Sequence, residues 1–277
     1  MHTIKEFITH EIPLVDKNET LYHAYKLMEK YGLDKIVIYD KIVEDGKRIV
    51  KKPVGVLTSR DIVFKLATER IRRLSTGRLH VSSFMSINPT CIGLNDDIRN
   101  AIKIMVEKGF GIIPVVENES IVGGLYRESL LRLCEKEETE VRHIMDTNPV
   151  VAKTTDRILK IRTEMLNNDI SFMPVVDEED KLVGYITIAD VAFAIFKFQD
   201  IVPEKYRKER IMHLIVEDVM RLRPPTLKFT DTIATAASKI IEKNSKGVVI
   251  VDETNRIAGI VTSHDIIRFI YEKYFKE

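Results

Sequence analysis

Gly184-Tyr-Ile-Thr-Ile-Ala-Asp190 carries the main evidence for the fold, because related stretches recur in order along the chain. An apolar, strand-like run passes through it, and a helix-like run begins at its end. The related stretches are Gly55-Val-Leu-Thr-Ser-Arg-Asp61, Gly123-Gly-Leu-Tyr-Arg-Glu-Ser129 and Gly259-Ile-Val-Thr-Ser-His-Asp265. Three of the four carry Thr-x-x-Asp, whereas the second carries Tyr126 and Ser129. This recurrence predicts four copies of one structural unit.

A methionine before a short polar turn repeats together with the glycine. The two lie 38 or 39 residues apart in the last three copies, from Met85 to Gly123, from Met145 to Gly184 and from Met220 to Gly259. The first copy lacks this methionine and carries an inserted polar stretch around residues 41–52. We therefore expect the first copy to follow the common pattern less closely.

Each copy reads as β-α-β-β-α over about 60 residues, a length typical of a repeated supersecondary unit. In the second copy we expect Asp96 to cap a helix that stops at Gly109. In the fourth, Asp231 is expected to open the corresponding helix. Hairpins such as Phe172–Val176 with Leu182–Ile186 follow, and the closing helix starts at Thr-x-x-Asp.

These elements predict an α+β fold with four units at residues 1–78, 79–136, 137–199 and 211–277. A single unit would leave a sheet face exposed and would be only marginally stable. We therefore expect the units to pair into two modules, residues 1–136 and 137–277. Helical linkers are expected around residues 68–80 and 197–213.

Composition narrows the classes of function. The 277 residues are 44% hydrophobic and carry a net charge of +1, which gives no global reason to expect nucleic acid or an acidic membrane as a partner. No apolar run approaches the roughly 20 residues that span a bilayer, so a cytoplasmic protein is expected. Two cysteines and seven histidines without ligand spacing predict neither a disulfide framework nor a metal site.

The chemistry concentrates where the last strand of each unit meets its closing helix. A helix N-terminus presents unpaired N–H groups and partial positive charge, which favour an anion. A hydroxyl there can bond a phosphate oxygen, and a carboxylate three residues on can accept hydrogen bonds from the two hydroxyls of a ribose. The hydroxyls belong to Thr58, Thr187 and Thr262, the carboxylates to Asp61, Asp190 and Asp265, and added charge to Arg60 and His264.

The alternative is that Thr-x-x-Asp is only a capping box, in which the two side chains satisfy the helix N–H groups. One isolated copy would favour that interpretation. Three copies in register favour binding instead, and the second copy starts its helix with Tyr126 and Ser129, which indicates that capping does not require the motif.

With the repeat established, the chain resembles the CBS-domain family, named for cystathionine β-synthase. The resemblance rests on the methionine-turn-proline openings, on strands such as Phe172-Met-Pro-Val-Val176, and on the Gly-x-x-Thr-x-x-Asp closings. It covers nearly the whole chain, and four-unit members include the nucleotide-sensing γ subunit of adenosine-monophosphate-activated protein kinase. The resemblance implies pairing into Bateman modules whose clefts bind adenosine nucleotides, or less often S-adenosylmethionine. It also implies that the base is held, largely by backbone, near Thr226, Phe172, Met173 and Gly247.

Three classes of function follow from these observations. The first is a non-catalytic regulator that binds AMP, ADP or ATP without metal, senses energy state, and acts on an unidentified protein, either as a single chain or as a homodimer formed through its modules. S-adenosylmethionine is the alternative ligand. The second class is a metal-assisted nucleotide hydrolase, although each aspartate lacks a second carboxylate or lysine in the pattern. The third is an adaptor in which the turns are only caps, and no nucleic-acid-binding motif supports it.

Overall fold

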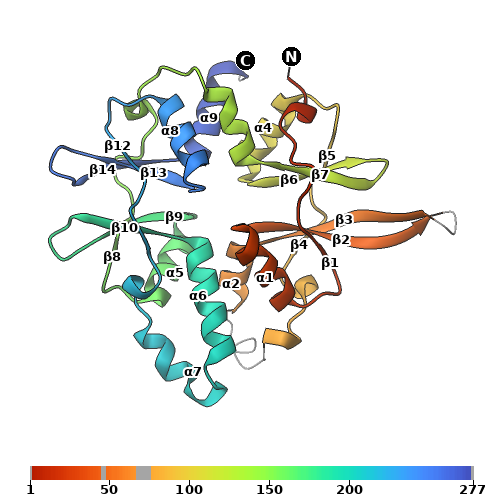
Figure 1. Cartoon of the computed structure of the whole chain (residues 1–277), viewed down its shortest axis with the longest axis horizontal. Helices are drawn as coiled ribbons and strands as arrows, with labels where there is room; N and C mark the ends of the chain where they lie inside the picture. The colour runs from red at the N-terminus through yellow and green to blue at the C-terminus, as the bar shows by residue number, and fades with distance from the viewer. Residues whose placement is uncertain (1, 45–47, 67–75, 276–277) are drawn as a thin grey trace. The chain divides into compact units, whose positions relative to one another are not determined.

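The computed structural model describes residues 2–44, 48–66 and 76–275, and it contains the predicted repeat four times (Figure 1). The first comprises β1 (Leu14–Asp16), α1 (Leu21–Tyr31), β2 (Lys35–Glu44), β3 (Arg48–Thr58) and α2 (Ser59–Leu66). The second comprises β5 (Ile92–Gly93), α4 (Ile98–Lys108), β6 (Ile112–Glu117), β7 (Ser120–Tyr126) and η4 (Arg127–Cys134). The third comprises β8 (Ala152–Lys153), α5 (Ile158–Asn167), β9 (Phe172–Val176), β10 (Leu182–Thr187) and α6 (Ile188–Ile201). The fourth comprises β12 (Thr226–Leu227), α8 (Ile233–Glu242), β13 (Gly247–Val251), β14 (Ile257–Thr262) and α9 (Ser263–Tyr274). The α+β class is confirmed, and so is the β-α-β-β-α order, except that the second repeat closes with a 3-10 helix.

Short 3-10 helices open the repeats, and the insertion in the first repeat lengthens its hairpin. The openings are η1 (Ile4–Glu6), η3 (Val81–Ser83), η5 (Val141–His143) and η7 (Val216–Asp218). The inserted residues extend β2 and β3 into a long antiparallel pair that projects from its sheet (Figure 1). The second predicted linker contains α7 (Glu204–Arg210), as expected, whereas most of the first lies outside the described residues.

In the second and fourth repeats the first helix begins one residue later than expected. Thr232 caps α8 by accepting a hydrogen bond from the N–H of Thr235, while Asp231 accepts one from Lys228 N–H at 2.8 Å. Asp96 likewise binds Gly93 N–H at 2.7 Å and leaves the start of α4 to the following residue, Asp97. The expectations for Asp96 and Asp231 were therefore wrong, because this carboxylate closes the turn before the helix.

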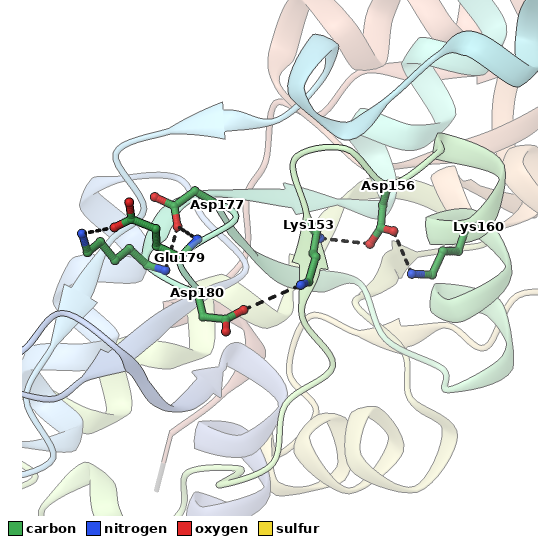
Figure 2. A network of polar contacts seen from close by, with 7 residues as sticks. Lys153, Asp156, Lys160, Asp177, Glu179 and Asp180 are labelled. Carbon is green, nitrogen blue, oxygen red and sulfur yellow. Dashed lines mark hydrogen bonds and ion pairs between the residues drawn. The ribbon is translucent and has the colours of Figure 1, made fainter.

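The third repeat shows the same device in Figure 2. Asp156 accepts a hydrogen bond from the N–H of Lys153 at 3.0 Å and an ion pair from Lys160 at 2.8 Å. In the same network Asp177 accepts bonds from backbone N–H groups in the hairpin turn that follows β9. Asp156 and Asp177 therefore stabilise turns by accepting bonds from backbone N–H groups, and this structural role requires no ligand.

Strand pairing exchanges segments between repeats. Within each sheet the repeat's own hairpin is antiparallel and its first short strand adds in parallel. Two further strands come from the partner repeat: β4 (Ser86–Ile87) pairs with β3, and β11 (Arg221–Leu222) pairs with β10. In the opposite direction, Thr9 of the first repeat forms a bridge with Gly124 of the second, and Asp146 of the third forms a bridge with Ile260 of the fourth. The first repeat therefore pairs with the second, and the third with the fourth, as the two-module prediction required.

This exchange explains why methionine and glycine recur together. A Cβ added to Gly55 would lie 2.5 Å from the sulfur of Met85, and one added to Gly184 would lie 3.0 Å from that of Met220. Each glycine thus leaves room for the methionine of the partner repeat. At Gly123 the same place is taken by Ile8, which stands where the first repeat lacks a methionine.

By its contacts the chain divides into two compact units. One comprises Met1–Ala101, Gly111–Tyr126 and Val191–Ile211, and the other Ile102–Phe110, Arg127–Asp190 and Met212–Glu277. The first unit holds the sheets of repeats one and two, with Tyr25 of α1 stacked on Phe196 of α6 at 4.3 Å between ring centroids. The second holds the sheets of repeats three and four, whose shared core includes Phe172, Tyr185 and Ile260.

Candidate nucleotide-binding turns

The three Thr-x-x-Asp turns have one common geometry. In each, threonine is the last residue of its strand and aspartate lies in the first turn of the following helix. The threonine N–H donates to aspartate Oδ2 at 2.9 Å and the hydroxyl donates to the same oxygen at 2.6 Å in all three copies. The aspartate N–H donates back to the hydroxyl, at 3.1 Å for Asp61, 3.2 Å for Asp190 and 3.4 Å for Asp265.

The capping interpretation is therefore part of the answer. These bonds form a reciprocal capping box that fixes the start of α2, α6 and α9. The second repeat, which has Tyr126 and Ser129 instead, closes with the 3-10 helix η4 rather than an α-helix. The sequence indicated that capping does not require the motif, because this copy also starts a helix. That helix is a 3-10 helix, so the second repeat is not a control for capping of an α-helix.

Capping uses only half of each carboxylate. Oδ2 accepts both bonds from threonine, so Oδ1 is the oxygen with capacity for a ligand. The three turns differ in what reaches Oδ1. Among the described residues, Ser86 Oγ lies 3.4 Å from that of Asp61, Arg221 Nε lies 2.8 Å from that of Asp190, and Arg268 Nη2 lies 2.9 Å from that of Asp265.

Burial also separates the turns. Thr187 and Asp190 are buried, at 4% and 9% exposed, whereas the corresponding residues of the other two turns are partly exposed. Arg221, which pairs with Asp190, has a raised pKa: burial alone would lower it, but the attraction and hydrogen bond of Asp190 outweigh that effect. Sequence reasoning missed Arg221 because it lies 31 residues away, in the next repeat.

The residues expected to hold the base lie near two of the turns. Phe172 is paired across the hairpin with Thr187, and Gly247 occupies the same place opposite Thr262. Met173 is fully buried and Phe172 is 2% exposed, so both side chains belong to the core. Thr226 lies on β12 beside β13, where its carbonyl accepts a bond from Lys239 at 2.7 Å.

The two residues expected to add charge behave differently. Arg60 lies partly exposed in the first turn of α2, beside Asp61. Burial and the nearby Arg127 lower the pKa of His264 below its ordinary 6.5, with a smaller opposing effect of Asp265. At pH 7 the ring is therefore mainly neutral and offers a hydrogen bond rather than a charge.

Two features are absent from the described residues. Residues 2–44, 48–66 and 76–275 contain no group of three or more histidine, cysteine, aspartate or glutamate side chains that could hold a metal ion. Nor does any helix in these ranges combine the length and apolarity needed to cross a membrane.

Comparison with known proteins agrees with this architecture. The fold and the exchanged strands define a protein of four β-α-β-β-α repeats paired two by two. A family model for the CBS domain matches residues 4–68, 81–136, 141–197 and 216–272. The chain belongs to the CBS-domain family.

Similar chains occur in Methanocaldococcus jannaschii. Protein MJ1404 is 25% identical over 275 residues, and the match covers 96% of this chain and 61% of that protein, so the chain spans about three fifths of that relative. Protein MJ1225 is 28% identical over 235 residues, covering 79% of this chain and 83% of that one. The L-aspartate semialdehyde sulfurtransferase of the same organism is 30% identical over 130 residues, which are 47% of this chain and 23% of that enzyme.

The crystal structure of MJ1225, described as a candidate archaeal homolog of g-AMPK, has the same fold. It superposes with a TM-score of 0.79 at 22% sequence identity and covers 97% of this chain and 100% of that chain. The likeness establishes the four-repeat arrangement.

Proposed function

We propose that this protein is a non-catalytic regulatory module that binds adenine nucleotides, AMP foremost, at its Thr-x-x-Asp turns. The observation that carries the proposal is the division of labour within the carboxylate. Oδ2 accepts the same two bonds from threonine in all three turns, so Oδ1 is the oxygen that would accept ribose hydroxyls, in competition with Arg221 at Asp190 and with Arg268 at Asp265. Beside it lie helix N–H groups, which attract phosphate.

The regulatory role follows from how the repeats are joined. Each Thr-x-x-Asp turn lies next to a strand or bridge contributed by the partner repeat, so a ligand that contacts both sides would bind one arrangement of the pair more tightly than another. Differential affinity of this kind is what allows a ligand to shift a conformational equilibrium. A related segment forms 23% of an enzyme, the L-aspartate semialdehyde sulfurtransferase. A segment of this kind therefore occurs together with an enzyme, which supports a partner protein as the target of the conformational change.

Thermal unfolding tests the proposal with AMP, ADP, ATP and S-adenosylmethionine as separate ligands. A ligand at 100 times its dissociation constant stabilises the folded state by about 2.7 kcal/mol. We expect the adenine nucleotides to raise the melting temperature, with inorganic phosphate as the matched control that leaves it unchanged. If only S-adenosylmethionine raises the melting temperature, the ligand is S-adenosylmethionine and not a nucleotide. If none of the four compounds raises it, the proposal is refuted.

The competing hydrolase function has a separate test. A hydrolase would turn over ATP in the presence of Mg²⁺, and that turnover would fall when Asp61, Asp190 or Asp265 is replaced. We expect no such turnover above a buffer control, because each of these aspartates lacks a second carboxylate or lysine in its sequence pattern. ATP hydrolysis that depends on one of the three would contradict the non-catalytic role.

A further inference from the structure

The residue that follows each methionine, or its substitute Ile8, lies next to the last strand of the partner repeat. These residues are Thr9, Ser86, Asp146 and Arg221. Register places Ser86 opposite Val56 and Arg221 opposite Tyr185, each one residue after the repeated glycine. This position therefore has the same place in the fold of every repeat, but the residue type at it differs between the four copies.

At two of the three Thr-x-x-Asp turns this residue reaches the carboxylate. Ser86 Oγ lies 3.4 Å from Asp61 Oδ1, at the outer limit of a hydrogen bond. Arg221 Nε lies 2.8 Å from Asp190 Oδ1, a short bond between two charged groups. Charge-assisted bonds of this kind are about twice as strong as neutral ones.

At the remaining turn, in the fourth repeat, the carboxylate of Asp265 pairs with an arginine of its own helix. Asp146 pairs with Ile260, and its carboxylate accepts a bond from the N–H of Asn148. Asp265 Oδ1 is instead paired with Arg268, one turn further along α9, whose side chain is 49% exposed. An exposed ion pair of this type is weak.

Acceptor capacity then differs between the turns. A carboxylate oxygen accepts about two hydrogen bonds. Among the described residues, only the long contact from Ser86 reaches Asp61 Oδ1. The Ser86 hydroxyl can rotate away from this oxygen, which can then accept both hydroxyls of a ribose. Asp190 Oδ1 already accepts the guanidinium of Arg221, and its side chain is 9% exposed, so little water weakens that bond.

We infer that the residue after the methionine sets the ribose affinity of the partner repeat's turn, and that Arg221 is a latch that weakens nucleotide binding at Asp190. The inference rests on the proposed function and makes it specific: the three turns form a graded series, in which Asp61 binds most tightly and Asp190 most weakly. Arg221 has a 43% exposed side chain and can leave Asp190 for solvent when ribose enters.

The test replaces Arg221 by serine and Ser86 by arginine, each in a variant in which only one of the three Thr-x-x-Asp turns keeps its aspartate. Asp→Asn at the other two positions preserves an oxygen for the cap and removes the second acceptor oxygen. With Asp61→Asn and Asp265→Asn in place, Arg221→Ser is expected to tighten adenosine and AMP binding at Asp190 about tenfold, the equivalent of one such bond. With Asp190→Asn and Asp265→Asn in place, Ser86→Arg is expected to weaken both ligands at Asp61 by about the same factor.

Isothermal titration calorimetry measures both dissociation constants, and circular dichroism confirms that each variant is folded. Unchanged adenosine affinity in Arg221→Ser would overturn the latch, and so would a loss of AMP affinity with adenosine unaffected, because Arg221 would then be a phosphate ligand. If Arg221→Ser does not fold, Ser86→Arg decides alone. Dissociation constants that change in neither Arg221→Ser nor Ser86→Arg refute only the latch. If no adenosine compound binds the unaltered chain, the proposed function is refuted as well.

Discussion

At the scale of single residues, the carboxylate of Asp61, Asp190 or Asp265 has two functions that act through different oxygens. The cap and the ribose acceptor were alternatives in the sequence, because a one-dimensional pattern does not distinguish Oδ1 from Oδ2. Geometry makes them compatible. A substitution can therefore separate stability from binding, depending on which atoms it removes.

Thr262→Ala should destabilise the fold by about 1 kcal/mol, the usual effect of losing a helix cap. The hydroxyl of Thr262 bonds both the carboxylate and the N–H of Asp265, and alanine removes both contacts. Urea unfolding followed by circular dichroism measures the change. Thr254→Ala is the matched control, because it removes a hydroxyl bond to Asp252 in an exposed hairpin turn but no helix cap. Equal effects at the two positions would contradict the capping role.

Some residue-level features could not have come from the sequence. The threonines and aspartates were found because they recur at fixed spacing. Arg221 was not found, since its partner Asp190 lies in another repeat and only the strand exchange brings them together. The lowered pKa of His264 likewise depends on burial and on Arg127, neither of which the local sequence reveals.

At the scale of elements, the strand exchange makes glycine necessary. Alanine at Gly55 would place its Cβ 2.5 Å from the sulfur of Met85 and 2.9 Å from the carbonyl oxygen of Ser86. Overpacking of this kind costs about 1–3 kcal/mol. We expect Gly55→Ala to lower the free energy of unfolding by that amount.

Gly77→Ala is the control, because a Cβ there would meet nothing within 4 Å. Adding Met85→Ala should restore part of the loss at Gly55, since the two side chains then no longer compete for one space. The free energies of unfolding of the single and double variants measure this coupling. Equal destabilisation at Gly55 and Gly77 would be inconsistent with the packing described.

The segment between the second and third repeats is tied to α9 by Glu137. This carboxylate is 7% exposed and accepts bonds from Lys273 at 2.8 Å and Tyr274 at 2.6 Å. Burial alone would raise its pKa, but these donors and Thr139 outweigh burial and lower it to about 2. The folded-state pKa lies below the ordinary 4.5, so the stabilisation is complete above pH 4.5 and is lost as the pH falls toward 2.

Glu137→Gln should therefore lower stability by about 2 kcal/mol at pH 7, a value reduced from the full shift because Lys273 is 41% exposed and solvent screens it. The difference from the unaltered chain should shrink between pH 4.5 and 2. Urea unfolding at several pH values measures it, with the exposed neighbour Glu138→Gln as control. A difference that is constant with pH would exclude the ion pair as its source.

The elements themselves were the most predictable level. Hydrophobic periodicity gave the strand and helix order of all four repeats, because each repeat tested the same pattern again. The helix caps at Asp96 and Asp231 were placed one residue early, since a turn-closing carboxylate and a capping carboxylate look alike in sequence. The closing segment of the second repeat was expected to be an ordinary helix and is η4, the copy without the capping pair.

At the scale of the whole molecule, four copies of one unit allow related sites to diverge. The pairing of repeats was predictable, because one unit alone leaves a sheet exposed. Which segments exchange was not, because that depends on contacts between residues far apart in the chain. The second repeat, with Ser129, is proposed to contribute strands to its partner but no ribose acceptor of its own.

Adenine nucleotides are proposed to bind at the three Thr-x-x-Asp turns. Isothermal titration of AMP into the unaltered chain and into the triple variant Asp61→Asn, Asp190→Asn, Asp265→Asn tests it most directly, with circular dichroism confirming that the variant is folded. We expect AMP to bind at up to three sites in the unaltered chain and at none in the triple variant. AMP binding of equal stoichiometry and affinity in both would contradict it.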